Sequence, residues 1–240
     1  MIIESINNEK VKYWRKIRTN KYINEYKEYI VEGEHLVEEA IKSGKAKYLI
    51  LLNGKDYDTN LEKYYVTEKV MNSISLLKSI PEVMCVVKIQ NDEINFKNKI
   101  VVLDDVQDPG NVGTIIRTAY AFNFNTIILS NKSASIYNDK VIRASQGMIF
   151  HTNIITGDLL EILPKLKEKG FKIYSTLMSG KIKPEEISQE KFAFVLGNEG
   201  IGISENVQKL CDNSISIPMN NKCESLNVAI SGAIIMYIKR

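Results

Sequence analysis

The sequence predicts an α/β protein with a mostly parallel sheet, preceded by a smaller α/β domain. Three observations support this fold class. Short apolar segments alternate with helical segments along most of the 240 residues. Residues 100–103, Ile-Val-Val-Leu, contain no polar side chain, as expected for a strand covered on both faces of a parallel sheet. Polar, glycine-containing loops follow several strands, at the sheet edge where such proteins bind ligands.

The composition is that of an ordinary globular protein of one or two domains. Hydrophobic residues make up 44% and charged residues 25% of the chain, and the net charge of +3 is too small to identify a nucleic-acid partner. No apolar run reaches membrane-spanning length, and the first residues lack a signal-peptide layout. The 3 cysteines form no CxxC pair. This argues against a disulfide framework or a zinc site, so we expect a cytoplasmic protein without metal or membrane.

Residues 1–95 are predicted to form the smaller domain. It begins with an amphipathic helix over residues 5–27, because Val11, Trp14 and Ile17 recur at three-residue spacing. Further apolar and β-branched runs predict strands at residues 29–31, 47–52, 61–66 and 83–89, and helices at residues 33–42 and 68–78. The polar segment 88–99 is predicted to be the interdomain linker.

The first helix is the only locally basic segment of the chain. Its basic side chains exceed its acidic ones, which are Glu9 and Glu25. Such a face can contact RNA phosphates, or it can be an ordinary solvated helix face, and the sequence leaves both interpretations open. The RNA-contact candidates in this helix are Lys10, Lys12, Arg15 and Arg18.

Residues 99–240 are predicted to form the larger domain, as a series of βαβ units. Strands are expected at residues 100–103, 126–129, 172–176, 192–196 and 214–217. Residues 104–113 are expected to be a turn. Helices are expected at residues 114–122, 139–148, 158–169 and 204–211, and from Leu226 onward. An apolar stripe in the last helix, with Ala229, Gly232, Ala233 and Met236, would permit close helix packing, either in the core or between subunits.

Three segments of this domain combine glycine with isolated polar residues after an apolar strand. They span residues 108–119, 196–202 and 217–232. In the second segment, Gly197, Gly200 and Gly202 would let the backbone approach a ligand closely. Their G-x-x-G-x-G spacing differs from the dinucleotide fingerprint, and Glu199 stands where a pyrophosphate would need room, which counts against an NAD-dependent oxidoreductase. In the third segment, Ser225 could cap the last helix, which would leave Asn227 unexplained.

Together the three segments resemble the motifs of the SpoU (TrmH-like) RNA 2′-O-ribose methyltransferases of the SPOUT superfamily. The N-x(5)-R pair corresponds to Asn111 and Arg117, the G-x-E-x-x-G element to residues 197–202, and the S-L-N-V-A element to residues 225–229. The resemblance covers residues 99–240. It implies a C-terminal trefoil knot, a homodimer and S-adenosyl-L-methionine as cofactor. Residues 1–95 are similar to the L30e-like RNA substrate-binding domain of many members, through the run Val-Glu-Gly-Glu-His that ends at His35.

The resemblance also implies roles for individual residues. The expected cofactor contacts are Leu196, Gly197, Gly200, Ile217, Met219 and Leu226. The candidate catalytic residues are Asn111, Arg117, Glu199, Ser225 and Asn227. Because arginine is effectively always protonated, we expect Arg117 to anchor the target phosphate rather than to act as a base; a structural salt bridge is the alternative.

The other candidates are expected to act around that anchor. Asn111 would orient Arg117 or the ribose, and Glu199 would fix the loops or the hydroxyl network. Ser225 and Asn227 would hydrogen-bond the substrate. Arg143 is either a second phosphate contact or a plain surface charge. Cys223 lies in the third segment and could indicate a covalent base methyltransferase, but that chemistry needs an activated thiolate and normally a different cofactor fold.

The sequence therefore predicts S-adenosylmethionine-dependent 2′-O-methylation of a ribose in structured RNA. We expect 23S ribosomal RNA as the substrate, because of the two-domain layout, with a transfer RNA as the alternative. A non-catalytic RNA-binding or ribosome assembly factor is a second alternative. It is disfavoured because all three motifs are intact.

Overall fold

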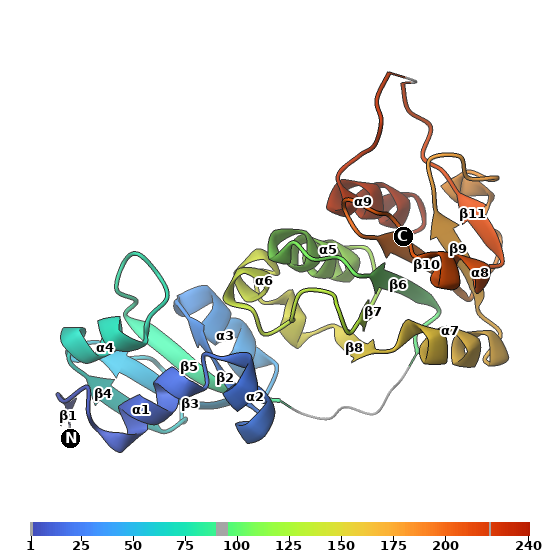
Figure 1. The fold of residues 1–240 in the computed structure, drawn as a ribbon. Coiled ribbons are helices and arrows are strands. Elements are labelled where there is room, and N and C mark those ends of the chain that lie inside the picture. The colour runs from blue at the N-terminus through green and yellow to red at the C-terminus, as the bar shows by residue number, and fades with distance from the viewer. Residues whose placement is uncertain (1, 90–95, 221) are drawn as a thin grey trace.

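The N-terminal part of the chain folds around a mixed five-stranded sheet with helices on both faces (Figure 1). The computed structural model describes residues 2–89, 96–220 and 222–240. The strand order is β1-β4-β3-β5-β2, and β5 runs antiparallel to β2 and β3. The strands are β1 (Ile2–Ile3), β2 (Glu28–Glu32), β3 (Ala46–Leu52), β4 (Lys63–Val66) and β5 (Val83–Lys88). The helices are α1 (Glu9–Lys16), α2 (Asn20–Tyr26), α3 (Glu34–Lys42) and α4 (Glu68–Ile74).

Alternation along β3 divides this domain into two hydrophobic layers. Tyr48 and Ile50 pack with α1 and α4 on one face, whereas Leu49 and Leu51 pack with α3 on the other. Successive side chains of a strand point to opposite faces, so one strand can serve both layers. On the first face, the indole Nε1–H of the fully buried Trp14 donates a hydrogen bond of 3.0 Å to the hydroxyl of Tyr48.

The single helix predicted over residues 5–27 is wrong, because the chain forms two helices there. The side chain of Asn8 caps α1, and the helix ends when Ile17 leaves the helical path. Thr19 then begins α2, which ends at Lys27 in the left-handed conformation with φ of 54°. Three-residue spacing of apolar residues fits one helix or two, because the turn between the helices also buries Ile17.

The C-terminal part contains a six-stranded sheet in the order β11-β9-β10-β6-β7-β8, and every neighbouring pair is parallel. The strands are β6 (Lys99–Asp104), β7 (Thr126–Ser130), β8 (Asn153–Gly157), β9 (Lys172–Thr176), β10 (Phe192–Gly197) and β11 (Asn213–Ile215). The helices are α5 (Pro109–Ala121), α6 (Asp139–Ala144), α7 (Leu159–Glu168), α8 (Glu205–Lys209) and α9 (Val228–Ile238), with short 3-10 turns η1 (Met148–Phe150) and η2 (Pro184–Glu186).

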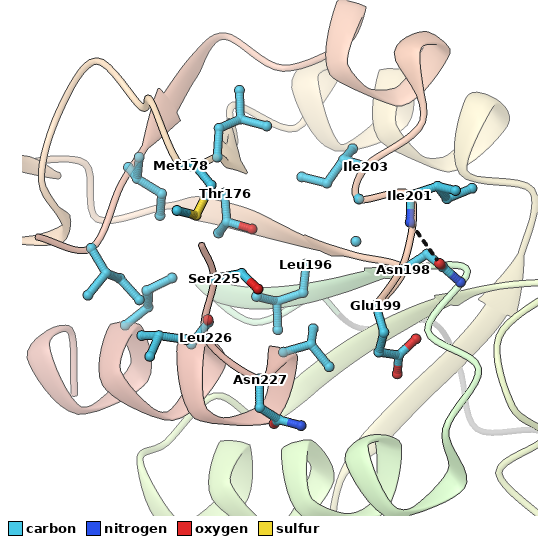
Figure 2. Close-up of a pocket in the computed structure, with 18 of the residues that line it drawn as sticks. Thr176, Met178, Leu196, Asn198, Glu199, Ile201, Ile203, Ser225, Leu226 and Asn227 are labelled. Atoms are coloured by element: carbon cyan, nitrogen blue, oxygen red, sulfur yellow. Dashed lines mark hydrogen bonds between the residues drawn. The ribbon is translucent and has the colours of Figure 1, made fainter. Parts of the chain in front are cut away.

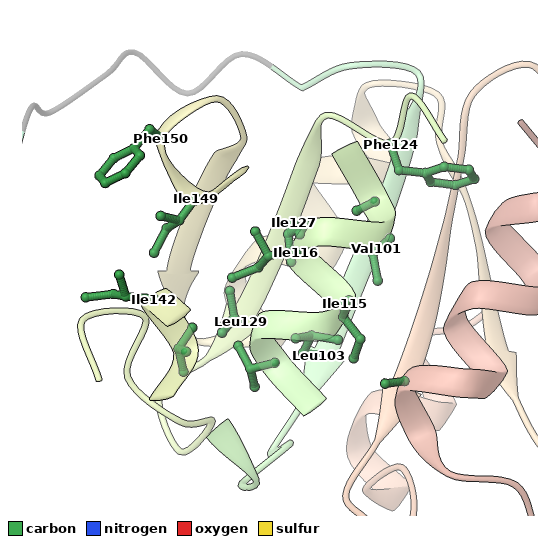
Figure 3. Close-up of a cluster of buried hydrophobic side chains, with 14 of the residues drawn as sticks. Val101, Leu103, Ile115, Ile116, Phe124, Ile127, Leu129, Ile142, Ile149 and Phe150 are labelled. Carbon is green, nitrogen blue, oxygen red and sulfur yellow. The ribbon is translucent and has the colours of Figure 1, made fainter. Parts of the chain in front are cut away.

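The apolar strand at residues 100–103 is covered on both faces, as the sequence predicts. Val101 and Leu103 face α5 and α9, in the cluster of Figure 3, whereas Ile100 and Val102 pack against α7. All four side chains are fully buried. Burial on both sides explains why this strand carries no alternating polar pattern.

The order of the strands creates a switch point beside β6. From β6 the chain continues to β7 and β8 on one side, and then returns to β9 and β10 on the other, so β10 lies against β6. Ligands of parallel α/β sheets bind where the connections diverge in this way, outside the carboxyl ends of the strands. The loops after β6 and β10 both begin at that edge.

Several predicted boundaries differ from the structure for local reasons. Helix α5 begins at Pro109, inside the predicted turn 104–113, because the side chain of Asp108 accepts the amide hydrogen of Asn111 at 2.9 Å and caps the helix. The sequence interpretation missed β8, although its β-branched run of Ile154, Ile155 and Thr156 suits a strand. Half of the predicted linker, residues 90–95, lies outside the described residues.

The resemblance also leads us to expect a trefoil knot in the C-terminal part, and this expectation stays a prediction. Within the described residues, no helix combines the length and apolarity needed to cross a membrane. Among the same described residues, no group of three or more histidine, cysteine or acidic side chains is arranged to hold a metal ion.

Candidate active site

The loop after β10 is a tight backbone turn in which glycine is required at its start. Asn198 and Gly202 exchange two backbone hydrogen bonds, of 3.0 and 2.9 Å, and Gly202 has a φ of 73°. A Cβ atom on Gly197 would lie 2.3 Å from the carbonyl carbon of Gly202, so no larger residue fits there. At Gly200 the nearest atom would be 3.5 Å away, an ordinary contact. The close approach at Gly197 is therefore to the chain itself.

Asn198 holds this loop through its side-chain amide, a role that the sequence interpretation missed. Its Oδ1 accepts the amide hydrogens of Gly200 and Ile201 at 2.9 and 3.1 Å, the latter drawn in Figure 2. Its Nδ2 donates to the carbonyl of Asp105 at 2.8 Å and so links the loop to the end of β6. An amide supplies a donor and an acceptor at once, which is the available sequence signal for such a role.

Glu199 connects the same loop to the first turn of α5. Its Oε1 accepts a hydrogen bond of 3.0 Å from Nδ2 of Asn111 and one of 3.3 Å from the backbone N–H of Asp108. Its Oε2 accepts the backbone N–H of Gln107 at 3.3 Å. Partial burial alone would raise the pKa of this carboxyl, but the hydrogen bonds from Asn111 and the backbone outweigh it and lower the pKa. Glu199 is therefore an ionised acceptor near neutral pH.

Asn227, rather than Ser225, caps the last helix. Its Oδ1 accepts the amide hydrogens of Ala229 and Ile230 at 2.9 and 3.2 Å, and α9 begins at Val228 rather than at Leu226. Its Nδ2 donates to Oδ1 of Asn111 at 3.0 Å. The residue that the sequence left unexplained thus caps a helix with one atom and contacts the site with the other.

These contacts form an ordered chain from Asn227 through Asn111 to Glu199, which we call the amide chain. The helix cap requires oxygen at one end of the Asn227 amide, so its nitrogen must face Asn111. Asn111 must then present its oxygen to Asn227 and its nitrogen to the carboxylate. Each amide orientation follows from its neighbours, and three residues from distant parts of the sequence are held in one geometry.

A pocket of about 530 Å³ opens beside the amide chain, at the switch point of the sheet (Figure 2). All six side chains or backbones expected to contact the cofactor line it: Leu196, Gly197, Gly200, Ile217, Met219 and Leu226. Glu199, Ser225 and Asn227 also line it. The remaining wall is largely apolar and includes Ile203, Ile215 and Ile235. An apolar cavity with a few convergent polar groups is the usual form of a small-molecule site.

Arg117 and Ser225 are both exposed, and of the two only Ser225 lines the pocket. Arg117 lies on α5 and is exposed, and within the described residues it has no hydrogen-bond or ion-pair partner. This argues against the structural salt bridge that the sequence left open. Asn111 does not contact Arg117 and binds Glu199 and Asn227 instead. Ser225 is also exposed, and its carbonyl accepts a contact of 3.4 Å from Sγ of Cys223.

The expected RNA contacts of the N-terminal helix divide into exposed and buried cations. Lys10, Lys12 and Arg15 are exposed, although Lys12 pairs with Glu9 at 2.7 Å. Arg18 differs from these three residues, and its role toward RNA stays a prediction. Its side chain is only 9% exposed and lies 2.7 Å from the carboxylate of Glu32, because it follows the end of α1 and turns inward.

The expected contact of the second domain, Arg143, is half-buried and paired. It lies 2.5 Å from the carboxylate of Asp139, one turn earlier on α6. This geometry is compatible with a surface charge, and the role of Arg143 toward RNA stays a prediction.

Comparison with known proteins identifies the family. The model of the SpoU rRNA Methylase family matches residues 98–237, more than half of the chain. The chain belongs to the SpoU rRNA methylase family. A second model, the MRM3-like substrate binding domain, matches residues 8–84.

Individual relatives of this SpoU methylase align over nearly their whole length. The chain is 34% identical to the 23S rRNA (guanosine(2553)-2′-O)-methyltransferase RlmP of Bacillus subtilis, covering 98% of this chain and 97% of the relative. A TrmH-family structure from Porphyromonas gingivalis superposes with a TM-score of 0.88 at 28% identity, covering 98% of each chain. An AdoMet-bound rRNA methyltransferase from Sinorhizobium meliloti gives 0.87 at 26% identity, covering 99% and 96%.

Proposed function

We propose that this SpoU methylase transfers a methyl group from S-adenosylmethionine to a ribose 2′-hydroxyl of 23S ribosomal RNA. The observation that carries the proposal is the coincidence of one apolar pocket with the amide chain at the switch point of the sheet. The family membership and the full-length similarity to a 23S rRNA 2′-O-methyltransferase support the same activity and substrate class.

The residues around the pocket suit S-adenosylmethionine. The pocket volume of about 530 Å³ lies within the range of small-molecule sites. Apolar side chains such as Ile217, Met219 and Leu226 would pack on the adenine and the thioether carbons, while the strand-end backbone would hydrogen-bond the polar edges. When bound, the cofactor supplies a sulfonium-activated methyl group.

Positioning is the main contribution of this chain to the reaction. Methyl transfer is an in-line displacement in which the ribose oxygen forms a bond to carbon, the carbon–sulfur bond breaks toward sulfur, and the hydroxyl proton is lost. Alignment of the reactants lowers the activation barrier by roughly 7–11 kcal/mol. A general base typically raises the rate by about 10²–10⁴-fold, which corresponds to a smaller reduction of the barrier. Arg117 anchors the phosphate beside the target ribose. Glu199 is too weak a base to dominate, because its pKa is lowered, so its role is to hold Asn111 and the loops.

The assembly and location are part of the proposal. We propose a homodimer, because α9 and the end of α5 expose Ile230, Tyr237 and Tyr120 at 53%, 53% and 40%. Exposed apolar side chains on adjacent helices are typical of subunit contacts. The protein would act in the cytoplasm, where ribosomal RNA is assembled.

The proposal is tested by incubating the purified protein with methyl-labelled S-adenosylmethionine and RNA from a strain that lacks the gene. We expect label in 23S rRNA at one ribose, and the guanosine named for the Bacillus relative is the first position to map. Label in transfer RNA instead would favour the transfer-RNA alternative. Absence of both transfer and cofactor binding by calorimetry would favour the non-catalytic assembly factor.

The amide chain yields a second test, in which aspartate and alanine at position 227 separate two roles. The variant Asn227→Asp keeps an oxygen for the helix cap but cannot donate to Asn111, whereas Asn227→Ala loses both contacts. We expect Asn227→Ala to lower the free energy of unfolding by about 1 kcal/mol and Asn227→Asp by much less. Both variants should lose most methyl transfer. Urea unfolding and the methylation assay measure the two effects; full activity of Asn227→Asp would exclude a role for the amide chain in catalysis.

A further inference from the structure

A second cavity, of about 660 Å³, lies between the two domains. We call it the interdomain cleft. The N-terminal domain lines it with α2, Lys27, Lys45 and the end of β5, which carries Lys88. The C-terminal domain lines it with the end of β7, the loop over residues 131–137 and the edge strand β8. The interdomain cleft shares no lining residue with the cofactor pocket.

The lining of the interdomain cleft is strongly cationic. Lys27, Lys45 and Lys88 belong to the lining, and no aspartate or glutamate is among the described lining residues. The whole chain has a net charge of only +3, so the cleft concentrates positive charge that the totals conceal. Lys27 and Lys88 are exposed, and their side-chain ammonium groups have no hydrogen-bond or ion-pair partner in the described part of the chain. Unpaired cations in a concave surface attract anions strongly.

Neutral hydrogen-bonding groups fill much of the remaining lining. Four asparagine side chains and five serine or threonine hydroxyls are present. Amides and hydroxyls commonly contact the phosphate and sugar groups of nucleic acids, as lysine does. The cleft therefore offers charge and polar groups for a ribose–phosphate chain.

Contacts between the domains flank the interdomain cleft and hold it open. The rings of Tyr29 and Tyr137 lie 5.1 Å apart across the boundary. Nε2 of His151 is 2.8 Å from the carboxylate of Glu39, and the ring of His35 contacts the carbonyl of Gln146 at 3.1 Å. These contacts join the two domains at several points, so the cleft exists before any ligand binds.

The loop that lines the interdomain cleft is also bonded to the strand end beside the active site. The amide of Ala134 donates to the carbonyl of Val106 at 2.9 Å. The hydroxyl of Ser130 donates to the carboxylate of Asp105 at 2.7 Å. Residues 105–106 continue directly to Gln107 and Asp108, whose amides bind Glu199. One short segment thus has the interdomain cleft on one side and the amide chain on the other.

We propose that the interdomain cleft binds the sugar–phosphate backbone of a single-stranded RNA segment that neighbours the target nucleotide. The inference rests on the proposed function for its biological substrate, but the binding is separable from catalysis. A single strand is favoured over a duplex because a cavity of about 660 Å³ holds a few nucleotides but not a double helix. Lysine contacts read the backbone, so the cleft adds affinity and register rather than sequence preference.

The test compares the full-length protein with the double variant Lys27→Gln/Lys88→Gln. Binding of a fluorescein-labelled oligouridylate is measured by anisotropy over a range of salt concentrations. We expect affinity at about 0.1 M salt to fall about 10- to 25-fold, and the slope of log K against log salt to become shallower by about 1.4, since each lost phosphate contact contributes about 0.7. The KM for 23S rRNA should rise while kcat and S-adenosylmethionine affinity stay unchanged.

The matched control is Lys165→Gln/Lys172→Gln, which removes the same charge from exposed lysines outside the cleft. It should retain near-normal affinity and salt slope. Equal binding by the cleft variant and the wild type would overturn the proposal, and equal losses on a labelled RNA duplex of matched length would overturn the single-strand assignment. If the wild type bound RNA but methylated none, the proposed function would fail while this inference stood.

Discussion

Replacing Arg117 with alanine should lower kcat for methyl transfer by about 10²–10³-fold while the protein stays folded. The guanidinium is exposed on α5 and has no intramolecular partner among the described residues, so its loss leaves no buried group unpaired. Surface changes of this kind alter the free energy of unfolding by about 0.5 kcal/mol or less. Loss of one preorganised donor at a reacting centre typically costs that factor in rate.

Single-turnover methylation of 23S rRNA measures this effect, with calorimetry of S-adenosylmethionine as the folding and binding control. Lys165→Ala is the matched variant, because it removes an exposed cation from α7 that does not belong to the pocket lining. Arg117→Lys keeps the positive charge but cannot form a bidentate contact with a phosphate. We therefore expect its kcat to lie between those of Arg117→Ala and the wild type. Wild-type activity in Arg117→Ala would exclude the anchoring role.

Gly197→Ala should destabilise the protein and abolish most cofactor binding, although it adds only a methyl group. The new Cβ would lie 2.3 Å from backbone atoms of Gly202 and Ile203, which cannot move without breaking the two hydrogen bonds between Asn198 and Gly202. Overpacking against fixed atoms costs about 1–3 kcal/mol, and contact with backbone belongs at the upper end. The displaced loop would also distort the pocket, so S-adenosylmethionine affinity should fall at least about tenfold.

Gly200→Ala is the control within the same loop. Its Cβ would meet nothing closer than Oδ1 of Asn198 at 3.5 Å, so the free energy of unfolding should stay near wild type and any loss of cofactor affinity should be smaller than in Gly197→Ala. Urea unfolding and calorimetry on the two variants give a direct comparison. If Gly197→Ala bound the cofactor as tightly as Gly200→Ala, the close crossing of the loop would have no part in forming the pocket.

The sequence predicts the elements of this fold better than their ends. The apolar strand at β6 is identifiable because burial on both faces leaves a distinctive composition. The start of α5 is not, because Asp108, Pro109 and Gly110 suit a turn as well as a capped helix start, and only the side-chain contact of Asp108 to Asn111 decides. Local patterns likewise could not show that Arg18 turns inward to Glu32.

The candidate site was likewise predictable only in part. Residue types and their order indicated which side chains belong together, but not which atoms meet. Asn227 could be a cap, a substrate contact or neither, and its two simultaneous roles depend on where α5 places Asn111. The amide of Asn198 shows only that it can donate and accept at once, and the sequence does not show which backbone groups it meets. The interdomain cleft was equally hidden, because its lysines come from separate segments.

The position of β10 has a consequence for how the protein is made. This strand lies between β6 and β9, yet the ribosome synthesises it after both of them. Until residues 192–197 emerge, β6 and β9 each present an open edge, and an unpaired edge strand is prone to wrong pairing. The N-terminal domain can fold early, but the C-terminal sheet depends on distant contacts that close slowly. Translation speed and chaperone supply should therefore influence the yield of active enzyme.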